Sequence, residues 1–157
     1  MGTRPLADLL AEWRAAERRL ERVAPAADVQ AAALDVVRSW VAYQDAALPP
    51  DSTEFMLVAD EDRRYVGVTR AVMAVLGYEP SELIGKRIDD LAHPEQSAAT
   101  SAEWQEFLAQ GRLDGVFVLR ARDGHAVACS YQARAHHPVP GFHMSRLWVD
   151  RLTAARP

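Results

Sequence analysis

The proline pair Pro49 and Pro50 divides the sequence into two segments with different hydrophobic periodicity. Proline lacks a backbone N–H and its ring clashes with the preceding helical turn, so a helix is expected to end before this pair. Apolar residues before the pair recur at three- and four-residue steps, whereas short β-branched and aromatic runs follow it. The sequence therefore predicts an N-terminal helical segment, residues 1–50, and a domain that contains strands, residues 51–157.

The helical segment, residues 5–48, is interrupted by Pro25, which predicts two helices joined at a bend. Its polar face carries charges of both signs, whereas a membrane-surface helix is usually basic there, so membrane insertion is not expected. The apolar face must be buried against the downstream domain, as a cap, or against a second copy of the chain. We predict a homodimer, and the candidate interface residues are Leu6, Leu9, Leu10, Trp13, Leu20 and Trp40.

The second segment contains strand and helix patterns in the order ββαααβββ. Strands are predicted at 55–59, 65–69, 113–121, 126–135 and 142–152, and helices at 71–76, 80–85 and 97–110. Asp123 and Gly124 form a strong turn signal between the two long strands. Because the last three strands follow one another through short loops, we expect an α+β fold with an antiparallel sheet and its helices on one face.

Four short motifs in this segment resemble the PAS family. They are VMAVLGYEPSELIG at 72–85, LAHPE at 91–95, RDG at 122–124 and WVDRLT at 148–153, where the aspartate lies one place earlier than in the family's closing D-I-T. The resemblance covers residues 54–153 and implies a five-stranded PAS fold with strand order 2-1-5-4-3 and helices that enclose a small-molecule cavity. PAS domains sense ligands, redox state or light and pair with other domains or with themselves, and the fold does not select among these roles.

Two cofactors found in this family are disfavoured by the residues at the matching positions. Oxygen-sensing members take their haem ligand from a histidine in the long helix that faces the sheet, and residues 97–110 contain none. His93 lies just before that helix and is interpreted as a residue of the segment that leads into it. Flavin-binding light sensors need a cysteine in a helix, whereas Cys129 lies in a predicted strand and is interpreted as a buried thiol. No cofactor is therefore predicted, and a haem or flavin sensor remains the alternative.

The cavity implied by the resemblance would be lined by one helix and by alternate residues of the strands. Trp104 and Tyr131 supply polar atoms that would orient an otherwise apolar guest. We therefore expect a hydrophobic small molecule as the ligand. The candidate lining residues are Trp104, Phe107, Leu108, Phe117, Leu119, Cys129, Tyr131 and Trp148.

Three histidines, His136, His137 and His143, cluster around a proline-rich turn, and imidazoles bind zinc, nickel or copper. No carboxylate or cysteine lies beside them in the sequence, so the turn is interpreted as a solvated loop and no metal site is predicted. The sequence also lacks the motifs of serine hydrolases, phosphate-binding loops and zinc proteases. We predict a protein without enzymatic activity.

Composition and charge bear on the remaining functional classes and on the cellular location. The net charge is −4 with no basic stripe, so nucleic-acid binding is not expected. The single cysteine excludes an intramolecular disulfide, and the start of the chain lacks a signal-peptide core, which predicts a cytoplasmic location. The alanine- and arginine-rich composition is typical of a high-GC bacterial genome. The sequence thus predicts a signalling or sensor module that acts through an unidentified partner protein.

Overall fold

The computed structural model of the 157-residue chain describes residues 3–22, 26–94 and 100–149. The N-terminal segment forms two helices, α1 (Leu6–Arg22) and α2 (Ala26–Ala47), on either side of the predicted interruption. The strands are β1 (Phe55–Ala59), β2 (Tyr65–Val68), β3 (Arg112–Arg120), β4 (Ala126–Arg134) and β5 (His143–Val149). The helices between β2 and β3 are α3 (Ala71–Leu76), α4 (Pro80–Leu83), α5 (Ile88–Leu91) and α7 (Thr100–Gln110).

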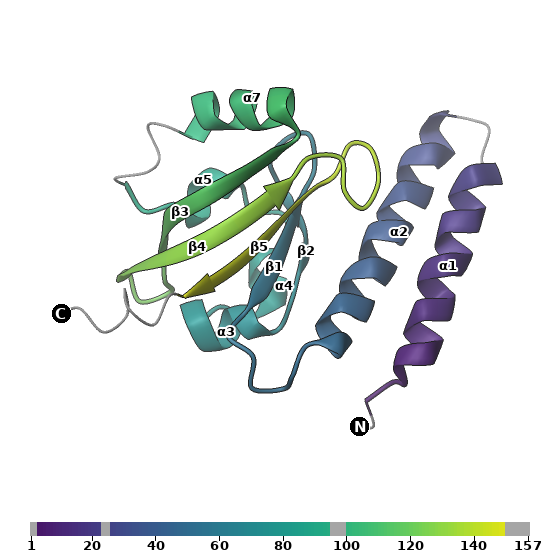
Figure 1. Ribbon diagram of the computed structural model, residues 1–157, viewed down its shortest axis with the longest axis horizontal. Helices are drawn as coiled ribbons and strands as arrows, with labels where there is room; N and C mark the ends of the chain where they lie inside the picture. Colours follow the sequence, from purple (N-terminus) through teal and green to yellow (C-terminus); the bar gives the residue numbers. More distant parts are fainter. Residues whose placement is uncertain (1–2, 23–25, 95–99, 150–157) are drawn as a thin grey trace.

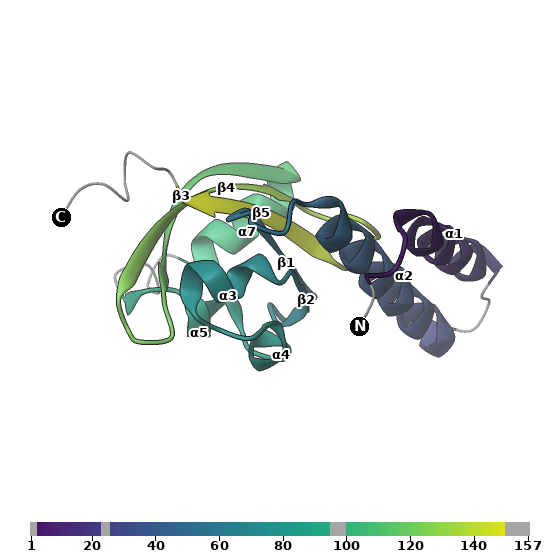
Figure 2. The ribbon, with the colours of Figure 1, turned by 90° about the horizontal axis from the view of Figure 1, so that it is seen from below.

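The five strands form one antiparallel sheet in the order β2-β1-β5-β4-β3, which confirms the strand order that the resemblance implied. β5, which closes the chain's last hairpin, lies between β4 and β1 at the centre of the sheet (Figure 1). Figure 2 shows α3, α4, α5 and α7 under the curved sheet, with the pair α1 and α2 beside it. We call the side covered by α3, α4, α5 and α7 the inner face and the opposite side the outer face.

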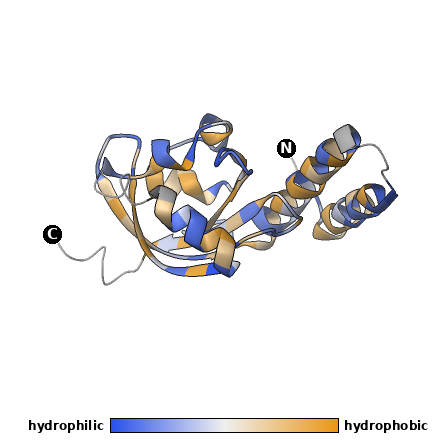
Figure 3. Cartoon of the chain, turned by 90° about the horizontal axis from the view of Figure 1, so that it is seen from above, coloured by the Kyte–Doolittle hydropathy of each residue, from blue (hydrophilic) through white to orange (hydrophobic). Residues whose placement is uncertain are grey.

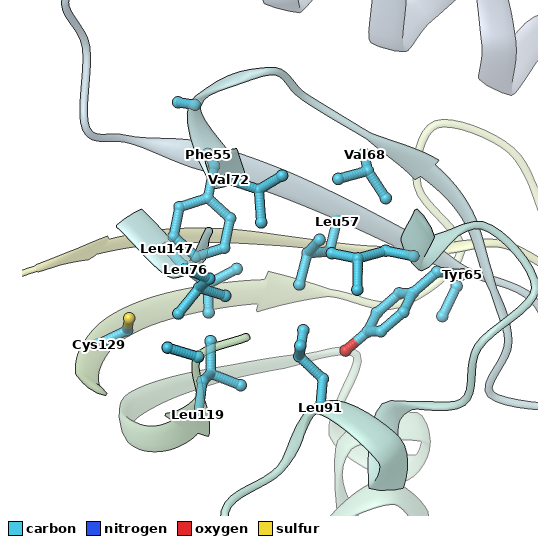
Figure 4. Packing of buried hydrophobic residues seen from close by; sticks show 14 residues of the cluster. Phe55, Leu57, Tyr65, Val68, Val72, Leu76, Leu91, Leu119, Cys129 and Leu147 are labelled. Carbon is cyan, nitrogen blue, oxygen red and sulfur yellow. The ribbon is translucent and has the colours of Figure 1, made fainter. Parts of the chain in front are cut away.

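The inner face carries a hydrophobic core made of alternate strand residues and of helix residues. Phe55 and Leu57 of β1 point to this face, and Leu147 of β5 lies opposite Phe55 in the strand register. Figure 4 shows that Leu76 of α3 and Leu91 of α5 reach into the same cluster. Because all five are almost completely buried, they fix α3 and α5 against the sheet.

The outer face is covered by α2 at its β1–β2 side. Met56 and Val58 alternate with the inner-face residues of β1 and are buried in one cluster with residues of α2. Gly67 of β2 allows the helix to lie close, because a Cβ at this position would come within 2.7 Å of the Cγ2 atom of Val41. The helix α1 packs on α2 through Ala16, which is fully buried (Figure 1). β1 is thus buried on both sides.

The structure differs from the sequence prediction at a few boundaries. α5 (Ile88–Leu91) is an element that the sequence does not predict, because a single turn is too short to show helical periodicity. Residues 97–99 of the predicted long helix and residues 150–152 of the predicted last strand lie outside the described residues. Hydrophobic residues run along both N-terminal helices among hydrophilic ones, as the amphipathic pattern predicted (Figure 3).

Candidate functional site

A cavity of about 100 Å³ lies between α7 and the inner face of the sheet. All five strands contribute to its wall, together with α5, α7 and the turn between β1 and β2. The strand residues that line the cavity are those whose side chains alternate onto the inner face, among them Leu57, Tyr131, Ser145 and Leu147. Figure 4 shows that Leu57 belongs equally to the neighbouring hydrophobic core, so the cavity continues that core towards the loop between β4 and β5.

Five of the residues predicted to line the cavity do line it. Trp104 and Phe107 come from α7, with ring centroids 5.7 Å apart, and they form the wall opposite the sheet. Phe117 and Leu119 of β3 and Tyr131 of β4 complete the apolar floor, and the rings of Phe117 and Tyr131 meet edge to face at 6.3 Å. The three strand positions could be predicted because hydrophobic residues alternate along β3 and β4.

Leu108, Cys129 and Trp148 are not part of the cavity wall. Leu108 follows Phe107 on α7 and therefore points about 100° away around the helix axis. Trp148 alternates with the inner-face residue Leu147, so its side chain lies on the outer face.

Cys129 points to the inner face but lies within the packed core rather than at the cavity. Its side chain is fully buried, and this burial raises the pKa of the thiol to about 11. A thiol of such low acidity is a poor nucleophile and a poor metal ligand at neutral pH. This environment agrees with a structural thiol and not with a redox-sensing one.

Four polar residues of the cavity wall were not among the predicted lining residues: Arg63, Glu103, His143 and Ser145. Arg63 forms an ion pair with Asp89, and its guanidinium lies 5.9 Å from the ring centroid of Trp104. The backbone of Arg63 has a φ of 64°, which is uncommon for a residue other than glycine. Because the sequence does not indicate this backbone conformation, the direction of the Arg63 side chain could not be predicted.

Tyr131 keeps a hydrogen-bonding group at the cavity. Burial raises the pKa of its phenol, and the carboxylate of Glu103 adds to this effect. The hydroxyl therefore stays protonated at neutral pH and can donate to a guest as well as accept from it.

His143 is the buried polar residue at the cavity end nearest the β4–β5 loop. Its ring meets Trp104 edge to face with centroids 5.1 Å apart, and its Nδ1 accepts a hydrogen bond of 3.0 Å from the backbone N–H of His136. The other nitrogen, Nε2, lies 3.4 Å from Oε1 of Glu61. Burial lowers the pKa of His143, against the opposing influence of the Glu61 carboxylate. The sequence interpretation of this segment as a solvated loop is wrong for His143, which is 3% exposed.

Glu61, His136 and His143 offer ligand atoms within 4.8 Å of one another, a distance that would suit a metal site. The hydrogen bonds oppose this use. Nδ1 of His143 accepts from the N–H of His136, and Nδ1 of His136 accepts from the N–H of Gly141. A neutral imidazole that accepts at Nδ1 carries its proton at Nε2, whereas a metal-binding imidazole needs Nε2 free and normally donates from the other nitrogen. The group therefore does not fit a metal ion as folded.

Haem and flavin do not fit the cavity as it stands. Pockets for ligands of drug or cofactor size usually occupy about 300–1,000 Å³, several times the volume found here. The described part of the long helix, α7, contributes Glu103, Trp104 and Phe107 to the cavity, and none of them is a histidine or cysteine, the usual haem ligands. The site suits a smaller and mainly apolar guest.

The predicted dimer-interface residues are largely buried within one chain. Leu9 and Trp40 are 6% and 4% exposed. Trp13 and Leu20 are half-buried against the outer-face cluster, and the rings of Trp13 and Tyr43 lie 5.5 Å apart between the two helices. Leu10 is also half-buried, whereas Leu6 is 44% exposed and is the candidate with the most surface left for a second copy.

Comparisons with known proteins agree with this architecture. A family model described as "PAS fold" matches residues 65–141. The PAS domain of a protein from Colwellia psychrerythraea superposes with a TM-score of 0.57 at 14% sequence identity, over 63% of this chain and 87% of that one. A search of curated proteins finds no match. Residues 65–141 thus match a PAS domain, and PAS domains are generally sensory modules without enzymatic activity.

Within residues 3–22, 26–94 and 100–149, no helix is both long enough and apolar enough to span a membrane.

Proposed function

We propose that this chain is a sensor that binds a small, largely apolar molecule in the cavity under α7. The observation that carries the proposal is the cavity itself, which lies inside an otherwise well-packed inner face and is walled by aromatic and aliphatic side chains. An apolar cavity offers water few hydrogen-bonding partners, so an apolar guest can enter it without displacing strongly bound water.

The cavity volume limits the size of the guest. A buried apolar cavity of about 150 Å³ accepts a benzene ring, and the cavity here, about 100 Å³, is smaller. The guest should therefore have no more than about six non-hydrogen atoms. Tyr131 and Ser145 would meet a single polar atom on such a molecule, while Phe107, Phe117 and Leu119 surround the rest.

The N-terminal helices are the proposed route to a partner. α2 lies directly on β1 and β2, whose inner-face residues line the cavity, so a change in the cavity reaches α2 through a single strand. We further propose that the chain forms a homodimer through the exposed side of α1, around Leu6. The sensor would act in a cytoplasmic signalling system. Light scattering at tens of micromolar tests it, and a clean mass of 17.4 kDa would remove the dimer from the proposal.

The ligand is tested by purifying the protein under native conditions, recording its absorption spectrum and extracting it under denaturing conditions for mass spectrometry. We expect a colourless protein that carries a stoichiometric small molecule without a chromophore. A Soret or flavin band would replace the proposal with a haem or flavin sensor, and an empty extract would shift it towards a protein-interaction module.

A variant separates specific binding from surface adsorption. Ala133→Leu places an isobutyl group into the cavity, whereas Ala128→Leu adds the same group on the opposite side of β4. We expect the first variant to lose the extracted molecule and the second to retain it. Equal retention by both would show that the molecule binds elsewhere.

A further inference from the structure

The loop that joins β4 to β5, residues 135–142, contacts both layers of the molecule. On its inner side, the ring of His136 meets the ring of the cavity residue His143 with centroids 4.8 Å apart. On its outer side, His137 meets Trp40 of α2 edge to face at 5.3 Å, and the buried Val139 belongs to the same cluster as α2. The loop is therefore a physical connection between the cavity and the N-terminal helices.

Two imidazole rings hold this loop in its fold. Nδ1 of His143 accepts a hydrogen bond from the backbone N–H of His136, and Nδ1 of His136 accepts one from the N–H of Gly141, both at 3.0 Å. An imidazole nitrogen accepts a hydrogen bond only while it carries no proton. Once protonated, it becomes a donor that faces another donor, and the contact turns from attractive to repulsive.

We propose that residues 135–142 form a proton-operated latch, in which protonation of His143 at Nδ1 breaks its hydrogen bond with the His136 N–H, opens the loop and so releases α2 from the sheet. The contacts that would be lost are the edge-to-face contact of His137 with Trp40 and the burial of Val139 and Phe142 under α2. The latch needs no ligand in the cavity, so it stands or falls separately from the proposed function.

The charges around His143 decide the pH at which the latch opens. From the β1–β2 turn, the carboxylates of Asp60 and Glu61 favour a protonated ring; His136 from the loop disfavours it. From α7, the nearest groups are the apolar rings of Trp104 and Phe107. The remaining charged residues of the cavity wall are Arg63 and Glu103.

Burial outweighs the carboxylates and lowers the pKa of His143. Burial likewise lowers the pKa of His137 on the α2 side, with Arg134 adding to the effect. In both cases the unfolded chain takes up its proton first as the pH falls. The latch should thus be fully closed above the ordinary histidine pKa of 6.5 and should weaken progressively below it.

Amide hydrogen exchange of the full chain, followed by NMR between pH 8 and pH 5, tests the latch directly. The N–H groups of His136 and Gly141 should be protected at pH 8 and lose at least tenfold in protection factor by pH 5. The amides of Val37 and Trp40 in α2 should lose protection over the same range, whereas those of β4 should not. Unchanged protection of His136 and Gly141 while the ring of His143 titrates would overturn the proposal.

Substitution then assigns the effect to His143. In His143→Asn the side-chain Oδ1 lies close to the position of Nδ1 and accepts at every pH, so the His136 amide should stay protected at pH 5. The matched control is His125→Asn, an exposed histidine in the β3–β4 turn, and it should behave like the unmodified chain. If both variants open alike at pH 5, His143 is not the group that operates the latch.

Discussion

The two faces of the sheet are packed differently, although β1 supplies alternate residues to both. On the outer face, Met56 and Val58 are buried under α2, and Gly67 lets the helix come as close as a backbone allows. On the inner face, Leu57 and Ala59 border a cavity of about 100 Å³. The closely packed region around Gly67 holds α2 in place, and the cavity on the inner face leaves room for a guest. The following variants test that difference.

Removing the central outer-face side chain should have the largest effect. Trp40→Ala deletes a ring that is 4% exposed and should lower the free energy of unfolding by about 3–5 kcal/mol. Trp148→Ala, on the same face but half-buried, should cost about 1 kcal/mol. Urea unfolding measures both. Similar losses for the two tryptophans would mean that α2 is not firmly packed on the sheet.

Adding one methyl group at the closest approach should have the next largest effect. In Gly67→Ala the new Cβ would lie 2.7 Å from Val41 Cγ2, so α2 must shift, at a cost of about 1–3 kcal/mol. Val41→Ala removes the clashing atom. The double variant should therefore be more stable than the sum of the two single losses predicts, as measured in a double-mutant cycle. Strict additivity would show that the helix does not depend on this contact.

A matched pair of alanines compares the two faces directly. Ala16→Leu adds three carbons at a fully buried position of the outer-face cluster and should cost about 1–3 kcal/mol through overpacking. Ala133→Leu adds the same atoms next to the cavity and should cost less than about 1 kcal/mol, because there is space to receive them. Urea unfolding ranks the two variants. The reverse order would contradict the placement of the cavity on the inner face.

Zinc should have the smallest effect. Since Nδ1 of both His136 and His143 accepts a backbone hydrogen bond, a zinc ion would have to displace protons from both Nε2 atoms and rearrange the loop. Thermal unfolding at pH 7.5 should show the same Tm with equimolar zinc as with EDTA. A clear rise in Tm that disappears in Glu61→Gln would establish a metal site and refute the tautomer argument.

Much of the fold was readable from the sequence because its signals are local. The stop at Pro49, the turn at Asp123 and Gly124 and the long alternating strands predicted the element order apart from α5, and alternation placed Phe117 and Tyr131 at the cavity. Trp148 could not be placed, because its face depends on a strand register that the sequence does not state.

The contacts between segments that are distant in the sequence could not be predicted from the sequence. Glu61 and His143 are far apart in the sequence and meet only because β1 and β5 are paired, with Ala59 opposite His143. The role of Gly67 is equally hidden, since it depends on where α2 lies. Local patterns predict elements and faces, whereas buried polar contacts follow from the tertiary arrangement.

The central claim is that the inner face contains an accessible apolar site. Xenon is a suitable probe, since it enters small apolar cavities and forms no hydrogen bonds. Under a few atmospheres of xenon, the NMR signals of Leu57, Phe117 and Leu119 should shift and saturate together, and Ala133→Leu should abolish the shifts. Saturable shifts confined to Met56, Val58 and other outer-face residues, or no saturable shifts, would contradict the account.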